Sequence, residues 1–162
     1  MKRITFLLMA LGAALLCTVS CEKNKKGYDG NPVSLGLSVR WAEMNVGAIE
    51  GDLDGVSVTL ADAIDYAAQN KKWSIPTVMQ WEELLNTDGV KVQPTLSPAG
   101  YLIIGKGGQS IFFPSGYYLC AGSKDAFETT YVDLSVLSML SEPSFATTTS
   151  KNMEFSLRLV RK

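Results

Sequence analysis

The sequence predicts an α+β domain in which two helices pack on small antiparallel sheets. Two stretches with helical spacing, 58–70 and 77–85, lie near the middle of the chain. From residue 100 onward, short apolar runs alternate with glycine-rich turns, as expected for antiparallel strands. The helices and most of the strands are therefore separated along the chain, which favours α+β over a regular βαβ repeat.

The N-terminus is predicted to be a secretory signal. Three residues, Met1 to Arg3, supply positive charge, and an apolar run from Ile4 to Leu16 follows. That run is shorter than the roughly 20 residues that cross a bilayer. We therefore expect residues 1–20 to be removed; an uncleaved membrane anchor is the alternative.

Ser20-Cys21 places a small residue before a cysteine and resembles a bacterial lipobox, although Thr18 stands where leucine is commoner. Cys17 suits lipidation less well, because bulky Leu16 would precede the cut. The resemblance implies lipidation at Cys21 and attachment to the outer membrane, with the periplasmic and the cell-surface face both open. Several acyl chains on one cysteine would hold the protein there durably.

Residues 21–31 are polar and rich in lysine, and they predict a flexible tether before a single domain at 32–162. Removal of 1–20 leaves 142 of the 162 residues and takes away Lys2 and Arg3, so the formal charge moves from −1 to −3. No basic face indicates nucleic-acid binding. Cys120 would be the remaining thiol, so no internal disulfide is expected, and the residue is interpreted as a buried apolar one rather than a reactive thiol.

The segment 33–48 begins the predicted domain. Leu35, Leu37, Val39 and Trp41 share one parity, which predicts a half-buried strand or two short strands broken near Gly36. Residues 49–57 follow as a loop.

The first helix is predicted at 58–70. Thr59 and Asp62 have the spacing of a helix start, and the apolar face is expected to contain Leu60, Ile64 and Ala67 with Ala68.

The second helix begins in the stretch KWSIPTVMQWEELL, residues 72–85. Thr77 can cap it while Gln80 reaches back to the Thr77 backbone N–H. Trp81, Leu84 and Leu85 then face the core, and Glu82 and Glu83 face solvent. This spacing indicates a packing helix that requires no chemistry.

The C-terminal half predicts a sheet. The segment 100–116 has two apolar runs around Gly105, Gly107 and Gly108, which predicts a hairpin. Strands are also expected at 116–122 and 130–140, with a polar loop at 142–152. In 153–162 we expect the alternating residues Phe155, Leu157 and Leu159 to point inward and Arg158 and Arg161 to point outward.

The order of LGLSVRWAEMNVGA, KWSIPTVMQWEELL, GQSIFFPSGYY and FSLRLVRK resembles the Fibrobacter succinogenes major paralogous domain, a family common in Bacteroidetes lipoproteins. That family is similar to the formylglycine-generating-enzyme (sulfatase-modifying factor) and C-type-lectin-like folds. The resemblance spans roughly 33–162 and implies a C-type-lectin-like domain. Ser74 replaces the family's usual arginine, the loop after VGA is shortened, and the family's YWSS-like segment is only faint near Thr130–Ser135, so surfaces built by those loops do not carry over.

The chain contains no histidine, which excludes Ser-His-Asp and Cys-His catalysis and HExxH zinc sites. The oxidase activity of the formylglycine-generating enzymes needs active-site cysteines, and Cys120 alone does not supply them. Glu82 and Glu83 are neighbours on a helix and point in different directions, so they do not form a glycosidase pair. We therefore expect a non-enzymatic protein without a cofactor.

Three candidate binding features remain. Asp52 and Asp54 are weak candidates for calcium ligands, because closely spaced carboxylates supply hard oxygen atoms, but a solvated turn explains them better. Gly100 to Lys106 matches GxxxxGK only superficially, because an apolar strand fills it and no serine or threonine follows. Tyr117, Tyr118 and Tyr131 could stack on sugars or anchor a protein partner, although alternate tyrosines are expected to face the core.

These observations predict a lipid-anchored envelope binding module for carbohydrate or a protein partner. A structural accessory subunit of an envelope or fimbrial assembly is the alternative.

Overall fold

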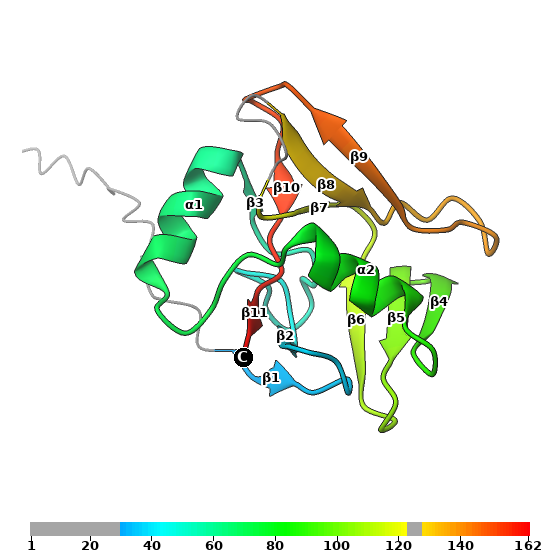
Figure 1. The fold of residues 1–162 in the computed structure, drawn as a ribbon. Helices are drawn as coiled ribbons and strands as arrows, with labels where there is room; N and C mark the ends of the chain where they lie inside the picture. The colour runs from blue at the N-terminus through cyan, green and yellow to red at the C-terminus, as the bar shows by residue number, and fades with distance from the viewer. Residues whose placement is uncertain (1–29, 123–127) are drawn as a thin grey trace, which may run out of the picture.

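The computed structural model describes residues 30–122 and 128–162. Cys21, the predicted signal peptide at 1–20 and residues 21–29 of the predicted tether lie outside the described residues. Within the described part there are two helices, α1 (Leu60–Gln69) and α2 (Val78–Asn86), and three small sheets. The predicted α+β fold is therefore confirmed (Figure 1).

The three sheets are almost entirely antiparallel; the β10–β7 pair is parallel. The first sheet has the order β1 (Pro32–Val33), β2 (Arg40–Ala42), β11 (Val160–Arg161). The second has the order β3 (Ser57–Val58), β10 (Phe155–Ser156), β7 (Tyr117–Leu119), β8 (Thr129–Asp133), β9 (Ser144–Thr148). The third has the order β4 (Lys91–Leu96), β5 (Ala99–Ile104), β6 (Ser110–Pro114). Because β11 pairs with β2, the two ends of the domain lie side by side (Figure 1).

The helix starts agree with the sequence. Thr77 caps α2 by accepting from the Gln80 backbone N–H, and the Gln80 side chain accepts from the Thr77 backbone N–H, which completes a capping box. Thr59 caps α1 by accepting from the Asp62 backbone N–H. The predicted buried face of α1 is partly wrong, because Ile64 is 54% exposed and Ala63 is buried instead. The core-facing residues are Leu60, Ala63, Tyr66 and Ala67, so Leu60 and Ala67 were predicted correctly, whereas Ile64 and Ala68 are exposed.

The sheets show three further differences. The hairpin of β5 and β6 is confirmed, but β4 was not predicted; its Pro94 is tolerated because β4 is an edge strand. The strand expected at 130–140 ends at Asp133, and the expected loop at 142–152 contains β9. Not all apolar residues of 134–140 are buried: Leu137, Met139 and Leu140 are exposed. The alternation of apolar and polar residues therefore gave a wrong end for this strand.

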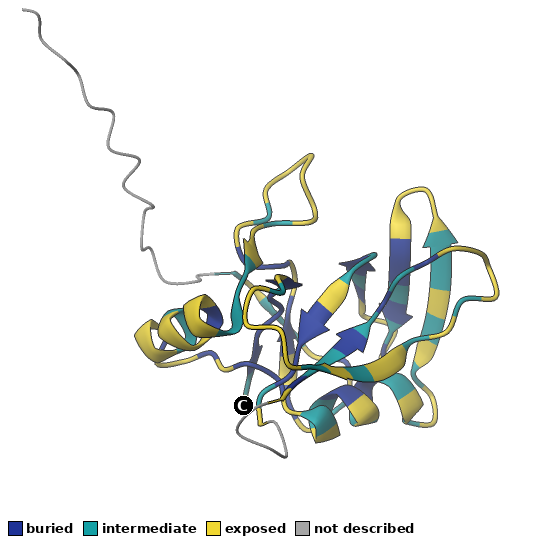
Figure 2. Ribbon diagram, turned by 90° about the horizontal axis from the view of Figure 1, so that it is seen from above, coloured by how far each residue is buried: buried dark blue, intermediate teal, exposed yellow. Residues whose placement is uncertain are grey.

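Aromatic side chains occupy the middle of the core. Trp81 of α2 lies edge-on to Trp41 of β2 with ring centroids 4.7 Å apart, and both rings are fully buried. Phe113 and Tyr118 join them from β6 and β7, with centroid distances of 5.5 and 5.7 Å to Trp81. The buried residues therefore gather between the sheets and the inner side of α2, while much of α1 is exposed (Figure 2). This confirms that α2 is a packing helix.

Arg158 corrects the expected orientation of the C-terminal strand. It was predicted to point outward, but only 1% of it is exposed. Its guanidinium donates to the carbonyl oxygens of Ala42, Glu43 and Phe112, and its Nε donates to Asn45 Oδ1. The strands around it are only two residues long, so period-two alternation does not hold between β10 and β11.

Candidate functional site

A cavity of about 620 Å³ lies between α2, the sheet of β4 and β5, and the segment 139–145. Most of its lining residues are apolar, but polar and apolar atoms share its surface about equally, and Glu142 is the one charged member. The lining residues are Leu85, Asn86, Val92, Pro94, Tyr101, Met139, Leu140, Ser141, Glu142, Pro143 and Phe145. We call this cavity the α2 groove.

The segment 134–143 carries most of the exposed apolar surface beside the groove. Leu137 is 91% exposed and Leu140 is 89% exposed, and Met139 between them is 58% exposed. A monomeric protein rarely leaves several large aliphatic side chains together in water, so such a cluster marks an interaction site.

Serine side chains hold this segment in shape. Ser141 Oγ accepts from the backbone N–H groups of Leu137 and Ser138, both at 3.0 Å. Ser138 Oγ accepts from the Leu140 N–H, and Ser115 Oγ accepts from the Val136 N–H. These local bonds replace the strand pairing expected here. The side chains of Leu137 and Leu140 are directed away from the core.

Tyr101 forms part of the lining from β5. It is fully buried, and its hydroxyl has no hydrogen-bond partner within the described residues. Burial raises the pKa of Tyr101, and the nearby carboxylates of Asp133 and Glu142 raise it further. A buried hydroxyl without a partner costs about 1–3 kcal/mol. Because this oxygen is enclosed by protein, it does not present its proton to the groove.

The edge of the five-stranded sheet adjoins the groove. β9 pairs with β8 on one side, and within the described part of the chain no strand pairs with its other side. Phe145 of β9 lines the groove and is 38% exposed. Unlike β4, β9 contains no proline, and all five of its residues are uncharged, so nothing in its sequence blocks the addition of another strand.

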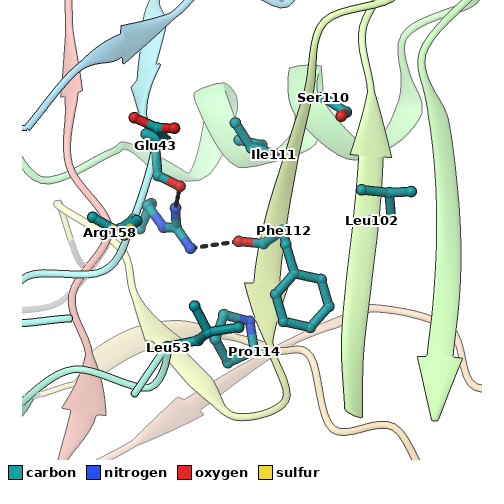
Figure 3. Close-up of a pocket in the computed structure, with 9 residues that line it drawn as sticks. Glu43, Leu53, Leu102, Ser110, Ile111, Phe112, Pro114 and Arg158 are labelled. Carbon is teal, nitrogen blue, oxygen red and sulfur yellow. Dashed lines mark hydrogen bonds between the residues drawn. The ribbon is translucent and has the colours of Figure 1, made fainter. Parts of the chain in front are cut away.

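Two smaller cavities surround Phe112 and Leu53, with volumes of about 280 and 270 Å³. Figure 3 shows the first, in which the Arg158 guanidinium is turned toward the carbonyl oxygen of Phe112 at 2.7 Å. The guanidinium carbon also lies 4.4 Å from the centre of the Phe113 ring. These contacts make Arg158 a link between strands, so we assign it a structural role.

The three candidate tyrosines do not share one surface. Tyr118 is fully buried; its hydroxyl donates to the Pro114 carbonyl and accepts from Asn45 Nδ2, so it is removed from the set of ligand-contacting residues. Tyr117, 41% exposed, contacts the half-buried Tyr131 edge-on with centroids 5.4 Å apart. By strand register these two lie on the opposite face of the sheet from Phe145, so they do not reach the α2 groove.

The other candidates are placed as follows. Asp52 and Asp54 are exposed, and the described residues contain no group of three or more carboxylate or thiol side chains that could hold a metal ion. Cys120 is 3% exposed, and burial raises its pKa to about 12, which keeps the thiol protonated and unreactive. Glu83 accepts from the Ser38 N–H and hydroxyl and so holds α2 to the segment before β2, whereas Glu82 is exposed.

No protein-family model matches the chain, and neither a curated protein nor a solved structure matches it. Within the part of the chain that the structure describes, no helix has both the length and the apolar character needed to cross a membrane. The site must therefore be interpreted from its own geometry.

Sequence reasoning missed the α2 groove. The apolar residues at 134–140 were interpreted as a strand, although the two serines of that stretch, Ser135 and Ser138, together with Ser141, indicate local turns. Tyr101 carried no signal at all, because a tyrosine in an apolar strand is usually a core residue.

Proposed function

We propose that the protein is a non-enzymatic, lipid-anchored binding module of the bacterial outer membrane, and that it binds a protein partner through the α2 groove. The observation that supports it best is the exposed pair Leu137 and Leu140 beside a groove lined by Phe145 and Tyr101. Lipidation at Cys21 and the C-type-lectin-like fold enter this proposal from the sequence resemblances. Membrane attachment and groove binding are separate parts of it.

A protein segment suits the groove better than a carbohydrate does. The large exposed side chains beside the groove are aliphatic (Leu137, Met139 and Leu140), and they suit the apolar side chains of a protein segment better than they suit a sugar. The free edge of β9 can hydrogen-bond an added strand, every second side chain of which would lie on the same face of the sheet as Phe145. We therefore propose that the partner presents an extended segment with apolar side chains.

The experiment is a photocrosslinking pull-down from envelope extract. It compares the wild-type chain with the double variant Leu137→Ser/Leu140→Ser, which changes the surface and leaves the core intact. Tyr117→Ala is the control, because Tyr117 lies on the opposite face of the sheet. The proposal expects a crosslinked partner that is lost with the double variant and retained with the control. A partner retained by both variants would contradict binding at the groove, and glycan-array binding unaffected by the double variant would favour carbohydrate at another surface.

The second candidate function is a structural accessory subunit of an envelope or fimbrial assembly. The unpaired edge of β9 favours it, because strand addition is a common way to join subunits. Its mark is a stoichiometric complex that survives detergent extraction and dissociates when Thr147→Pro removes a backbone donor from the free edge of β9, since the strand register directs the Thr147 N–H away from β8. A partner that exchanges readily in detergent would favour the binding module.

A further inference from the structure

A second cavity, of about 480 Å³, carries a different chemistry from the α2 groove. Its lining residues are Gly30, Gln69, Asn70, Lys71, Lys72, Trp73 and Arg161. Three of these are cationic and none is acidic, although the formal charge of the whole chain is −1. No ion pair joins Lys71, Lys72 or Arg161 to any described residue. We call this cavity the basic cavity.

The cations are positioned by backbone contacts. Lys71 and Lys72 occupy the turn after α1, which closes when the Trp73 N–H donates to the Asn70 carbonyl at 3.1 Å. Asn70 Nδ2 donates to the Tyr66 carbonyl at 2.8 Å, which satisfies part of the negative end of α1. The next residue, Ser74, exchanges two backbone hydrogen bonds of 2.9 Å with Val160. This bridge holds Arg161 near Trp73, and the guanidinium carbon lies 5.4 Å from the centre of the indole ring.

A cross-strand pair of like charges adds to this surface. Arg161 of β11 lies directly opposite Arg40 of β2 in the antiparallel register. Like charges at such a position repel, so their placement has no explanation in the stability of the sheet. An anion bound beside the two arginines would relieve their repulsion and would explain why they are placed opposite each other.

The basic cavity lies at the point where the domain joins its predicted anchor. Gly30, the first described residue, lines it. Gly30 lies nine positions after Cys21, and a fully extended chain over that distance spans at most about 30 Å. With the lipid of Cys21 in the bilayer, no other part of the domain is tied so closely to the membrane surface.

We propose that the basic cavity binds the anionic phosphate headgroups of the membrane that carries the protein. This inference rests on the lipid anchor of the proposed function and not on the groove. Lys71 and Lys72 supply charge, and Arg161, ordered against Trp73, supplies planar donors for a phosphate.

The test reports the environment of the cavity directly. The mature lipoprotein carries Gln69→Cys at the cavity or, as the matched control, Gln93→Cys on β4; both glutamines are exposed. Each variant is labelled with an environment-sensitive fluorophore, which the buried Cys120 does not take up. The proteins are reconstituted in vesicles of phosphatidylcholine alone or with phosphatidylglycerol.

The proposal expects the label at position 69, and not the label at 93, to shift to an apolar spectrum and resist acrylamide quenching in the anionic vesicles. Lys71→Ala/Lys72→Ala should lower the ratio of docked to undocked protein about 30-fold, since each cation near an anionic surface contributes about fivefold. The charge-matched control Lys91→Ala/Lys106→Ala should dock as the wild type does, and high salt should abolish docking.

Equal spectra in neutral and anionic vesicles, or docking unchanged by Lys71→Ala/Lys72→Ala, would overturn the proposal. The same spectral shift produced without vesicles, by inorganic phosphate or by a single-stranded oligonucleotide, would also overturn it and assign the cavity to a soluble anion or to nucleic acid. The mass of the mature protein is measured first. If Cys21 carries no lipid, the predicted lipid anchor is wrong. A spectral shift of the label at position 69 when this protein is added to preformed anionic vesicles would still support the headgroup site.

Discussion

Arg158 and Asn45, 113 positions apart in the chain, are joined by a buried hydrogen bond of 2.8 Å from the arginine Nε to the amide oxygen. The same asparagine donates from Nδ2 to the Asp54 carbonyl and to the Tyr118 hydroxyl. One polar pair therefore ties the C-terminal strand, the 49–57 loop and the central β7 together beneath the aromatic core. Such a network is stable only when each of its members is satisfied.

Replacement of Arg158 by methionine should destabilise the domain by about 3–5 kcal/mol, because it leaves Asn45 and three carbonyl oxygens without their donor. Urea unfolding followed by tryptophan fluorescence measures this change. Arg40→Met is the control and should change stability by no more than about 0.5 kcal/mol, since Arg40 is exposed. A small effect of Arg158→Met would mean that water replaces the guanidinium easily.

Trp81→Ala should lower the free energy of unfolding by about 3–5 kcal/mol, because the ring is fully buried against Trp41, Phe113 and Tyr118. Met79→Ala on the same helix is the control, because Met79 is 78% exposed. Equal losses for the two variants would show that helix propensity, and not core packing, sets the stability of α2.

Thr77→Ala should destabilise the protein by about 1 kcal/mol through loss of the capping box of α2. Since Thr77 and Gln80 bond each other's backbone, the double variant Thr77→Ala/Gln80→Ala should lose less than the sum of the single variants. Strict additivity in this thermodynamic cycle would contradict the reciprocal arrangement.

Tyr101→Phe should leave the free protein as stable as the wild type or slightly more stable, because it removes a buried hydroxyl that has no partner in the described structure. The same variant should leave binding at the α2 groove unchanged, because the hydroxyl is enclosed by protein and does not contact a ligand there. Thermal unfolding and a binding titration separate these effects. A clear loss of stability in the free protein would show that the hydroxyl already has a partner.

Alkaline pH should destabilise the domain. Burial raises the pKa values of Tyr101 and Tyr118 above 10.0 and that of Cys120 from 9.0 to about 12, so the native state holds these protons more tightly than the unfolded state does. The resulting stability is fully present below about pH 9 and is lost as pH rises through the raised pKa values. Unfolding midpoints at several pH values test this, and Cys120→Ala should reduce the slope. Rapid labelling of Cys120 in the native protein near pH 9 would contradict the burial of its thiol.

Local sequence determined the features whose cause is local. The capping residues Thr59 and Thr77 predicted both helix starts, the glycines at 105, 107 and 108 predicted the β5–β6 hairpin, and the spacing of Trp81 and Leu84 predicted the packing face of α2. In each case a few consecutive residues hold all the hydrogen-bonding groups or the periodicity that the element needs, so no distant contact was required to predict it.

Tertiary structure alone decided which residues are buried between elements and which surfaces they form. Arg158 is inside because distant carbonyl oxygens and Asn45 surround it, and Leu137 and Leu140 are exposed because no element of residues 30–122 and 128–162 covers them. Lys71, Lys72 and Arg161 line one cavity because β11 bridges to Ser74. Burial and charge at these positions depend on contacts between residues far apart in the chain, and local alternation contains no information about such contacts.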